Sequence, residues 1–226
     1  TLKNNGYEPF IATGRSPAET RDIMESANIH SGIFMNGQVV LYRDQLVYSS
    51  EIPTETVEKF HQMVKEDGYG LTAYNDKQFY LVASSPGAKD AYGFIHSNPP
   101  ALNPDFYKEN PINMMLFISL PPAEEKYKVA FPNLDFLRNT PYSVDVISKG
   151  NSKAEGIKRF LEHLNQEDAK TYAFGDGPND IEMLQAVSHP VAMGNALPIL
   201  KEIAEYITTD NTDNGIVNGL KHYGLI

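Results

Sequence analysis

The segment AFGDGPNDIEML, residues 173–184, places two carboxylates and a carboxamide close together, at Asp176, Asn179 and Asp180. Carboxylate and amide oxygens are the hard ligands that Mg²⁺ prefers. Asp176 directly follows an apolar run typical of a buried strand, which makes it the candidate metal ligand. Asp180 would orient that ligand from the start of the next helix, and Asn179 would donate to a phosphate oxygen. The alternative is that these residues only cap the helix.

A second candidate group lies in ATGR, residues 12–15. Thr13 offers a hydroxyl and a backbone N–H, and Gly14 lets the backbone approach an anion closely. The helix that follows adds the positive end of its dipole. Arg15 is a candidate substrate contact or, equally, half of a surface ion pair. The alternative for the whole segment is an ordinary strand-to-helix turn with a helix cap.

A third candidate is Lys153, in the segment SKGNSKAEG. It lies in the first turn of a predicted helix, where a cation is unfavourable for the helix dipole unless an anion is held nearby. Helical spacing puts it on one face with Ile157, Phe160 and Leu164, so it is directed toward the sheet. The alternative is a surface lysine whose stem lies along apolar residues.

Strands alternating with short helices must position these residues. We predict strands at 9–13, 172–175 and 190–193, a short buried strand ending at Asn36-Gly37, a hairpin around 43–45, and helices from 17, at 153–164, 180–187, 197–206 and 216–222. Ser16 with Glu19, and Ser152 with Glu155, form the capping pattern of a helix start. The alternation predicts an α/β fold with a parallel sheet covered on both faces. Ligands bind beyond the carboxyl ends of such strands.

The middle of the chain has a different pattern. One helix around 53–68 carries apolar Val57, Phe60 and Val64, and further strands are predicted at 71–74, 79–83, 114–120, 134–137 and 143–147, with a helix at 123–131. We therefore expect an inserted α+β domain at 52–146 and a core domain formed by 1–51 and 147–226. Tyr74, Tyr80 and Tyr92 are candidate substrate contacts in the inserted domain, or packing residues.

Composition limits the function classes. The 226 residues are 41% hydrophobic and 21% charged, with a formal net charge of −10, which argues against nucleic acid or an anionic membrane as a partner. The chain has no cysteine, so disulfides and thiol catalysis are excluded, and a cytoplasmic location is expected. The longest apolar run, MMLFISL, is too short to span a bilayer. The sequence does not indicate an oligomeric state.

The ordered segments ATGR, MNG, SKGNSKAEGI, FGDGPNDIEML and VAMGNA, with the inserted domain between the second and third, resemble the Cof-type, subclass IIB phosphatases of the haloacid dehalogenase (HAD) superfamily. The resemblance implies a Rossmann-like, doubly wound core with an inserted cap that selects substrate. It implies phosphate binding by Thr13, Gly14 and Lys153 and a Mg²⁺ ligand at Asp176, with Asn179 and Asp180 beside it. The implied activity is Mg²⁺-dependent hydrolysis of a small phosphate ester such as a sugar phosphate.

One motif of that family is missing. Its first motif, Asp-x-Asp-Gly-Thr, carries the aspartyl nucleophile and the general acid/base, and no Asp-x-Asp occurs in the 226 residues. We expect this motif upstream of Thr1, on a strand between the strands that end at Thr13 and Gly175. Two alternatives stay open: a phosphate-binding pseudoenzyme without a nucleophile, and an α/β binding domain whose acidic loop only caps a helix.

Overall fold

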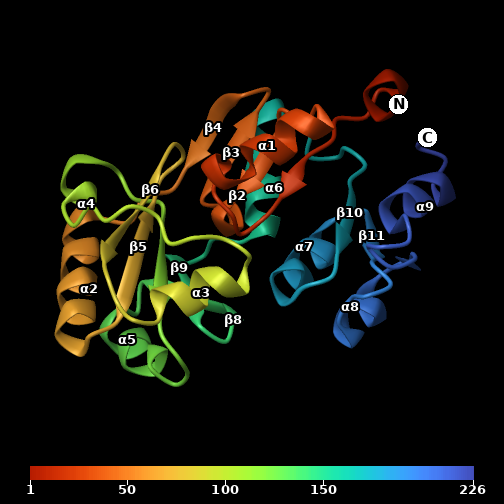
Figure 1. Ribbon diagram of the computed structural model, residues 1–226. Helices are drawn as coiled ribbons and strands as arrows, with labels where there is room; N and C mark the ends of the chain where they lie inside the picture. The colour runs from red at the N-terminus through yellow and green to blue at the C-terminus, as the bar shows by residue number, and fades with distance from the viewer. The chain divides into compact units, whose positions relative to one another are not determined.

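The computed structural model describes the backbone of residues 1–226 and every side chain except that of Asn139. The chain forms two compact units (Figure 1). Residues 1–13, 24–48 and 152–226 make the first unit, and residues 14–23 and 49–151 make the second. The expected domain boundaries lie a few residues from the divisions at 48 and 151. The grouping of residues 14–23 with the second unit was not expected.

A four-stranded sheet opens the first unit. Its strands are β1 Ile11–Ala12, β2 Gly32–Phe34, β3 Val39–Tyr42 and β4 Gln45–Ser49, in that order. β1 runs parallel to β2, and β2 runs antiparallel to β3. The predicted hairpin is confirmed, because Arg43 and Asp44 join β3 to β4 with φ of 50° and 63°. Two left-handed residues give the turn that matches the twist of the flanking strands.

A second, three-stranded sheet holds β10 Tyr172–Gly175, β11 His189–Ala192 and β12 Tyr206–Ile207, all parallel. The prediction that the helix from 197 continues to 206 is wrong. Helix α8, Pro198–Ile203, ends where Ala204 turns to an extended conformation, and the N–H of Glu205 bonds to the carbonyl of Pro190. A strand of two residues is too short to show alternation of apolar and polar residues. The helical spacing of the preceding residues therefore favoured a helix at this position.

Helix α6, Lys153–Leu164, packs on the first of these sheets, beside β2 in Figure 1, and also contacts helix α7, Ile181–Ala186, which follows β10. Ile157 contacts the apolar clusters of both sheets, and Phe160 packs on Phe10 with ring centroids 4.4 Å apart. Among the described strands, β1 pairs only with β2 and β10 only with β11. β1 and β10 therefore do not pair with each other, and each keeps one edge without a described strand partner.

Six further helices of the described chain, outside its inserted part, connect these strands or flank them. They are η1 Leu2–Asn5, α1 Pro17–Ala27, η2 Met35–Gly37, η3 Pro178–Asp180, α7 Ile181–Ala186 and α9 Gly215–His222. At the start of α1 the N–H of Ser16 donates to Glu19 at 2.8 Å, and the N–H of Glu19 donates back to the Ser16 hydroxyl at 3.4 Å. Both predicted capping pairs are confirmed, since Ser152 likewise accepts from the N–H of Glu155.

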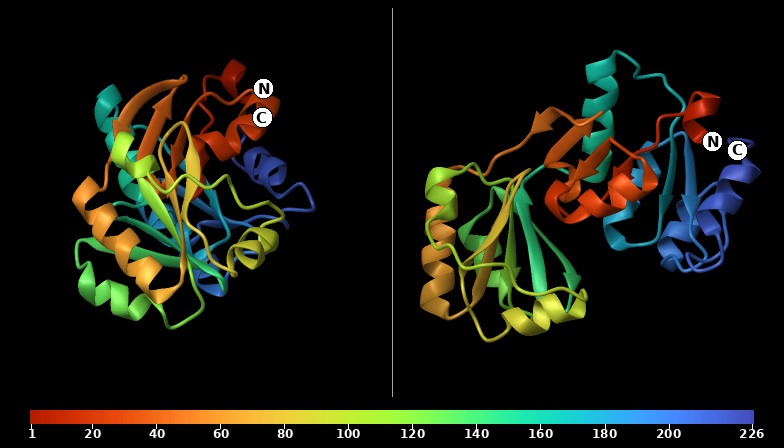
Figure 2. Two further views of the ribbon diagram at one scale, coloured as in Figure 1. Left: turned by 60° about the vertical axis from the view of Figure 1, so that its left-hand side comes forward. Right: turned by 45° about the horizontal axis from the view of Figure 1, so that its top comes forward.

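The second unit is a five-stranded antiparallel sheet with helices on both faces. Its elements are α2 Thr54–Asp67, β5 Gly70–Tyr74, β6 Phe79–Ala83, α3 Ala88–Phe94, α4 Phe106–Glu109, β7 Met114–Ile118, α5 Glu124–Ala130, β8 Leu134–Thr140 and β9 Ser143–Ser148. α2 runs beside the sheet (Figure 2) and buries Val57, Phe60 and Val64 completely, as its spacing predicts. α3 places Tyr92 in a separate apolar cluster. No helix among the described residues is long and apolar enough to cross a membrane.

Candidate active site

The acidic loop after β10 is shaped by Asp180. This residue is 5% exposed, and its Oδ2 accepts the backbone N–H groups of Asp176 and Gly177, each at 3.0 Å. Its Oδ1 accepts from the Lys153 ammonium at 2.6 Å. A carboxylate that receives two backbone N–H groups and a cation holds the loop in one conformation. Asp180 therefore fixes both the loop and the lysine.

Lys153 is only 5% exposed, which excludes the surface-lysine alternative. It begins α6 directly after Ser152, and its ion pair with Asp180 joins α6 to the loop after β10. A buried cation is tolerated when an opposite charge and hydrogen bonds satisfy it. An ammonium carries three N–H donors, and among the contacts of the described residues Asp180 uses one. The remaining donors suit an anionic ligand.

Asp176 has a different environment from Asp180, because its side chain is exposed. Its Oδ2 accepts from the amide of Asn195 at 2.8 Å, and its backbone carbonyl accepts from Leu197. The Asn195 carbonyl in turn accepts the N–H of Asn211 at 3.2 Å, which fixes the direction of the amide. Among the described contacts, Oδ1 of Asp176 stays without a hydrogen-bond donor. Asn195 was not predicted to have a role, although it follows β11 as Asp176 follows β10.

Thr13 and Asn179 are linked through Asn36. The N–H of Asn36 donates to the carbonyl of Thr13 at 3.1 Å, and the Asn179 amide donates to Oδ1 of Asn36 at 3.0 Å. The backbone N–H of Thr13 donates to the carbonyl of Ile33 at 2.9 Å. The expectation that this N–H faces an anion was therefore wrong, because it continues the pairing of β1 with β2. The hydroxyl of Thr13 remains the candidate phosphate donor.

The structure thus brings together five of the predicted site residues in a network within the first unit: Thr13, Lys153, Asp176, Asn179 and Asp180. Its hydrogen bonds form two sets, one linking Thr13 to Asn179 through Asn36 and one linking Lys153 to Asp176 through Asp180, and the sets meet where Asn179 and Asp180 are neighbours in the chain. Gly14 and Arg15 follow Thr13 directly but are grouped with the second unit. The Arg15 side chain is exposed.

The sequence matches the protein family described as "haloacid dehalogenase-like hydrolase" over residues 1–220. The chain belongs to this family. It is 37% identical over 226 residues to the Bacillus subtilis protein named "Putative phosphatase YkrA", covering all of this chain and 88% of that protein. The crystal structure of a hypothetical protein from Geobacillus kaustophilus HTA426 matches with a TM-score of 0.93 at 32% identity, covering all of this chain and 88% of the other.

A structure described as the HAD subclass IIB sugar phosphatase BT4131 matches with a TM-score of 0.84 at 27% identity, and covers all of this chain and 88% of that one. The fold is therefore the mixed α/β fold of HAD hydrolases with a cap domain, and the resemblance to subclass IIB is confirmed.

Members of the HAD family generally depend on Mg²⁺, and the donor atoms of this chain fit part of a Mg²⁺ site. Among the described residues, no three His, Cys, Asp or Glu side chains form a group that could hold a metal ion. Both oxygens of Asp180 are occupied by N–H donors, whereas Asp176 is exposed with one oxygen without a described partner. Mg²⁺ binds through one or two carboxylates and keeps several waters. Asp176 fits as one ligand, and other groups must complete the coordination.

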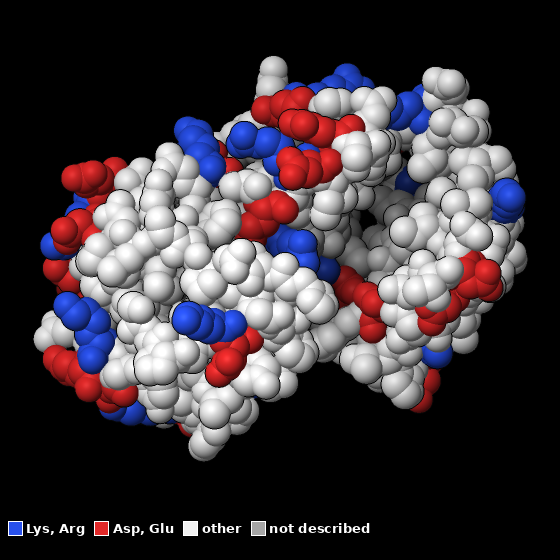
Figure 3. Space-filling model, in the orientation of Figure 1, with Lys and Arg blue, Asp and Glu red and all other residues white. Residues whose placement is uncertain are grey.

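Charge is not segregated on the face of the molecule drawn in Figure 3. Acidic and basic side chains are interspersed over that face, and no continuous basic surface forms on it. The formal net charge of −10 means that the overall charge of the chain does not attract an anion. The buried ammonium of Lys153 provides a localised cation in the network described above.

The three tyrosines considered as substrate contacts all make packing contacts in the second unit. Tyr92 and Tyr74 are 1% and 2% exposed, and their hydroxyls are 3.0 Å apart. The Tyr92 hydroxyl also lies 2.8 Å from the hydroxyl of Thr72. Burial raises the pKa of Tyr92 to about 12 and that of Tyr74 well above its ordinary value. Tyr80 packs on Phe106. These contacts favour the packing interpretation.

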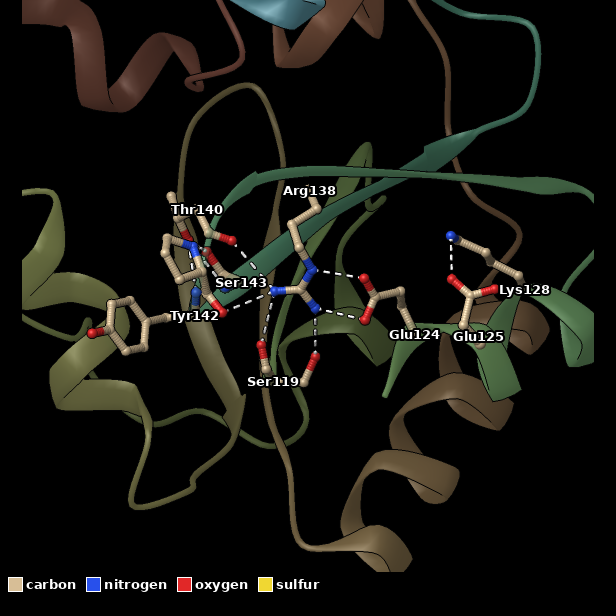
Figure 4. Close-up of polar contacts among 9 residues, drawn as sticks. Ser119, Glu124, Glu125, Lys128, Arg138, Thr140, Tyr142 and Ser143 are labelled. Atoms are coloured by element: carbon tan, nitrogen blue, oxygen red, sulfur yellow. Dashed lines mark hydrogen bonds and ion pairs between the residues drawn. The ribbon is translucent and has the colours of Figure 1, made fainter. Parts of the chain in front are cut away.

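A cavity of about 720 Å³ lies in the second unit, and none of the predicted site residues lines it. One wall is the segment 118–123, whose conformation depends on a neighbouring ion pair (Figure 4). The Arg138 guanidinium donates to the two oxygens of Glu124 at 2.6 and 2.7 Å and to the carbonyl of Ser119 at 3.1 Å. This pair holds the pKa of the Glu124 carboxyl below its ordinary value. The Arg138–Glu124 ion pair therefore fixes the segment 118–123 of the second unit.

Proposed function

We propose that this HAD hydrolase is a Mg²⁺-dependent phosphatase for a small phosphorylated metabolite, such as a sugar phosphate. The observation that carries the proposal is the Lys153–Asp180–Asp176 array, in which a buried cation and an exposed carboxylate are held by one shared residue. The names of two similar proteins, YkrA and the sugar phosphatase BT4131, support the same reaction class. We further propose that residues 52–146, which lie within the second unit, are the cap.

Each residue of the network then has a role toward the phosphate ester. The Lys153 ammonium compensates negative charge on the phosphoryl group, an effect that acts strongly in a site shielded from water. Asn179 directs one N–H to Asn36, so its second N–H is available for a phosphate oxygen. The Thr13 hydroxyl donates to another oxygen. Asp176 would hold Mg²⁺, which supplies further positive charge when bound. Arg15 is a candidate contact for the rest of the substrate.

The nucleophile is proposed to lie outside residues 1–226, on a segment that precedes Thr1. A carboxylate there would attack phosphorus and form an acyl phosphate while the P–O bond to the leaving group breaks. The general acid of the same segment would give its proton to the leaving alkoxide, which departs as the alcohol, and water would then hydrolyse the acyl phosphate to phosphate and the free carboxylate. A strand of this segment would pair between β1 and β10, each of which has an edge without a described partner. Unpaired backbone groups inside a sheet cost free energy, roughly 1–3 kcal/mol each, which favours such a strand.

Phosphate release from a panel of sugar phosphates tests the proposal. We expect no turnover by the 226-residue protein, and turnover that requires Mg²⁺ by a protein extended with its natural preceding segment. Turnover by the 226-residue protein, with contaminating phosphatase excluded, would show that the nucleophile assignment is wrong. If the extended protein binds inorganic phosphate with Mg²⁺ but does not turn over, the pseudoenzyme alternative holds.

A further inference from the structure

The turn Met35–Gly37 has an unusual backbone for a buried segment. Its three residues have φ of 49°, 54° and 93°, so all three are in the left-handed region. Met35 is fully buried and Asn36 is 1% exposed. Left-handed conformations are unfavourable for L-residues other than glycine, although asparagine tolerates them better than most. Strain of this kind persists where the surroundings hold it, and it clusters at functional sites.

This turn contacts all three loops that carry the proposed phosphate site. Its Asn36 N–H holds the carbonyl of Thr13, and its Asn36 Oδ1 accepts from Asn179. Gly37 lies so close to α6 that a Cβ on it would be 2.1 Å from the carbonyl oxygen of Ser152. The turn therefore contacts the loop after β1, the loop after β10 and the residue before Lys153.

We propose that Asn36 is a positioning residue for phosphate binding, an inference that rests on the proposed function. Its Oδ1 takes one N–H of Asn179 and so fixes the rotation of that amide. The second N–H of Asn179 is then held in the direction of the ligand, because an amide nitrogen carries two donors in one plane. Asparagine suits this position for two reasons: it tolerates the left-handed φ, and its short side chain presents an acceptor.

Binding of inorganic phosphate in saturating Mg²⁺ tests this role, measured by titration calorimetry on the protein extended with its natural preceding segment. Asn36→Gly removes the carboxamide and keeps a residue that accepts φ of 54°. Asn179→Ala removes the partner. The control is Asn165→Gly, at an exposed residue with φ of 52° that ends α6. We expect Asn36→Gly and Asn179→Ala each to weaken phosphate binding roughly threefold to tenfold, as loss of one hydrogen bond does.

The double variant should bind no more weakly than the weaker single variant, because both changes remove the same interaction. The side-chain NH₂ resonances of Asn179, identified by their loss in Asn179→Ala, should move in Asn36→Gly and stay in Asn165→Gly. Affinity of Asn36→Gly within twofold of Asn165→Gly would overturn the inference, as would single losses that multiply in the double variant. If the unsubstituted extended protein binds no phosphate, the proposed function fails as well. If it binds phosphate and Asn36→Gly does so equally well, only the role of Asn36 fails.

Discussion

Replacing Gly37 by alanine probes how tightly the buried turn is packed against the start of α6. The new Cβ would lie 2.1 Å from the carbonyl oxygen of Ser152 and 2.8 Å from its carbonyl carbon. Both are backbone atoms, so no side-chain rotation relieves the contact. The backbone of Gly37 also has φ of 93°, which alanine adopts only with strain. The substitution therefore combines a conformational cost with a steric one.

The two costs can be separated by a matched variant. A left-handed conformation costs an L-residue about 1–2 kcal/mol, and overpacking a buried site costs about 1–3 kcal/mol. We expect Gly37→Ala to lower the unfolding free energy of the first unit by about 2–5 kcal/mol, as the sum of these terms. Gly6 has φ of 86° and no atom within 4 Å of its would-be Cβ. Gly6→Ala should therefore show the conformational term alone.

The assay must report on the first unit by itself, because the chain contains two compact units. Hydrogen exchange of peptides from α6, followed through a urea series, meets this need. Inorganic phosphate affinity should fall in Gly37→Ala and stay unchanged in Gly6→Ala, since movement of Ser152 moves Lys153. If the two variants destabilise α6 equally, within about 0.5 kcal/mol, Gly37 is not pressed against Ser152 and the reasoning fails.

Three further predictions follow from the described contacts. Lys153→Ala, in the extended protein, should reduce turnover on the order of 10²-fold or more, as loss of a preorganised charge does; an initial rate within threefold of the unsubstituted protein would contradict its role. Asn195→Ala should weaken Mg²⁺ binding roughly tenfold in a calorimetric titration with the metal alone, because Asp176 loses the donor that orients it; unchanged affinity would remove that role. Arg138 keeps the pKa of Glu124 below its ordinary 4.5, so the ion pair stabilises the second unit above that pH and its contribution is lost as pH falls through the lower, folded pKa. The unfolding free energy of the second unit, measured in urea between pH 3 and 6, should lose this part of its pH dependence in Glu124→Gln. Identical pH profiles for Glu124→Gln and the unsubstituted protein would refute this contribution of the ion pair.

Local signals in the sequence predicted local structure well. The capping pattern at Ser152 predicts the start of α6 correctly, because a side chain and a backbone N–H three residues apart decide where a helix begins. The strand Tyr172–Gly175 is also correct, since a short apolar run with alternate residues buried predicts a strand. β12 was missed because its two residues are selected by pairing with β11, a contact that no nearby residue encodes.

The sequence suggested candidate site residues but not the contacts between them. The sequence indicated Lys153 and the acidic loop, while the ion pair between Lys153 and Asp180 joins residues 27 positions apart. Asn36 and Asn195 were missed although both lie in quoted segments, MNG and VAMGNA. Each is a carboxamide placed just after a strand of the first unit, and such carboxamides deserve the same scrutiny as carboxylates at that edge.

The two aspartates of the loop have the same chemistry and different surroundings, and the surroundings decide their functions. Asp180 is buried and receives three N–H donors, which take up most of the lone pairs of its two oxygens and leave little room for a metal ion. Asp176 is exposed and receives one donor, from Asn195, on one oxygen. The cost of leaving buried donors unpaired keeps Asp180 in place. A cation that entered this loop would therefore bind more readily at Asp176, as we propose, while Asp180 fixes the backbone from which Asp176 extends.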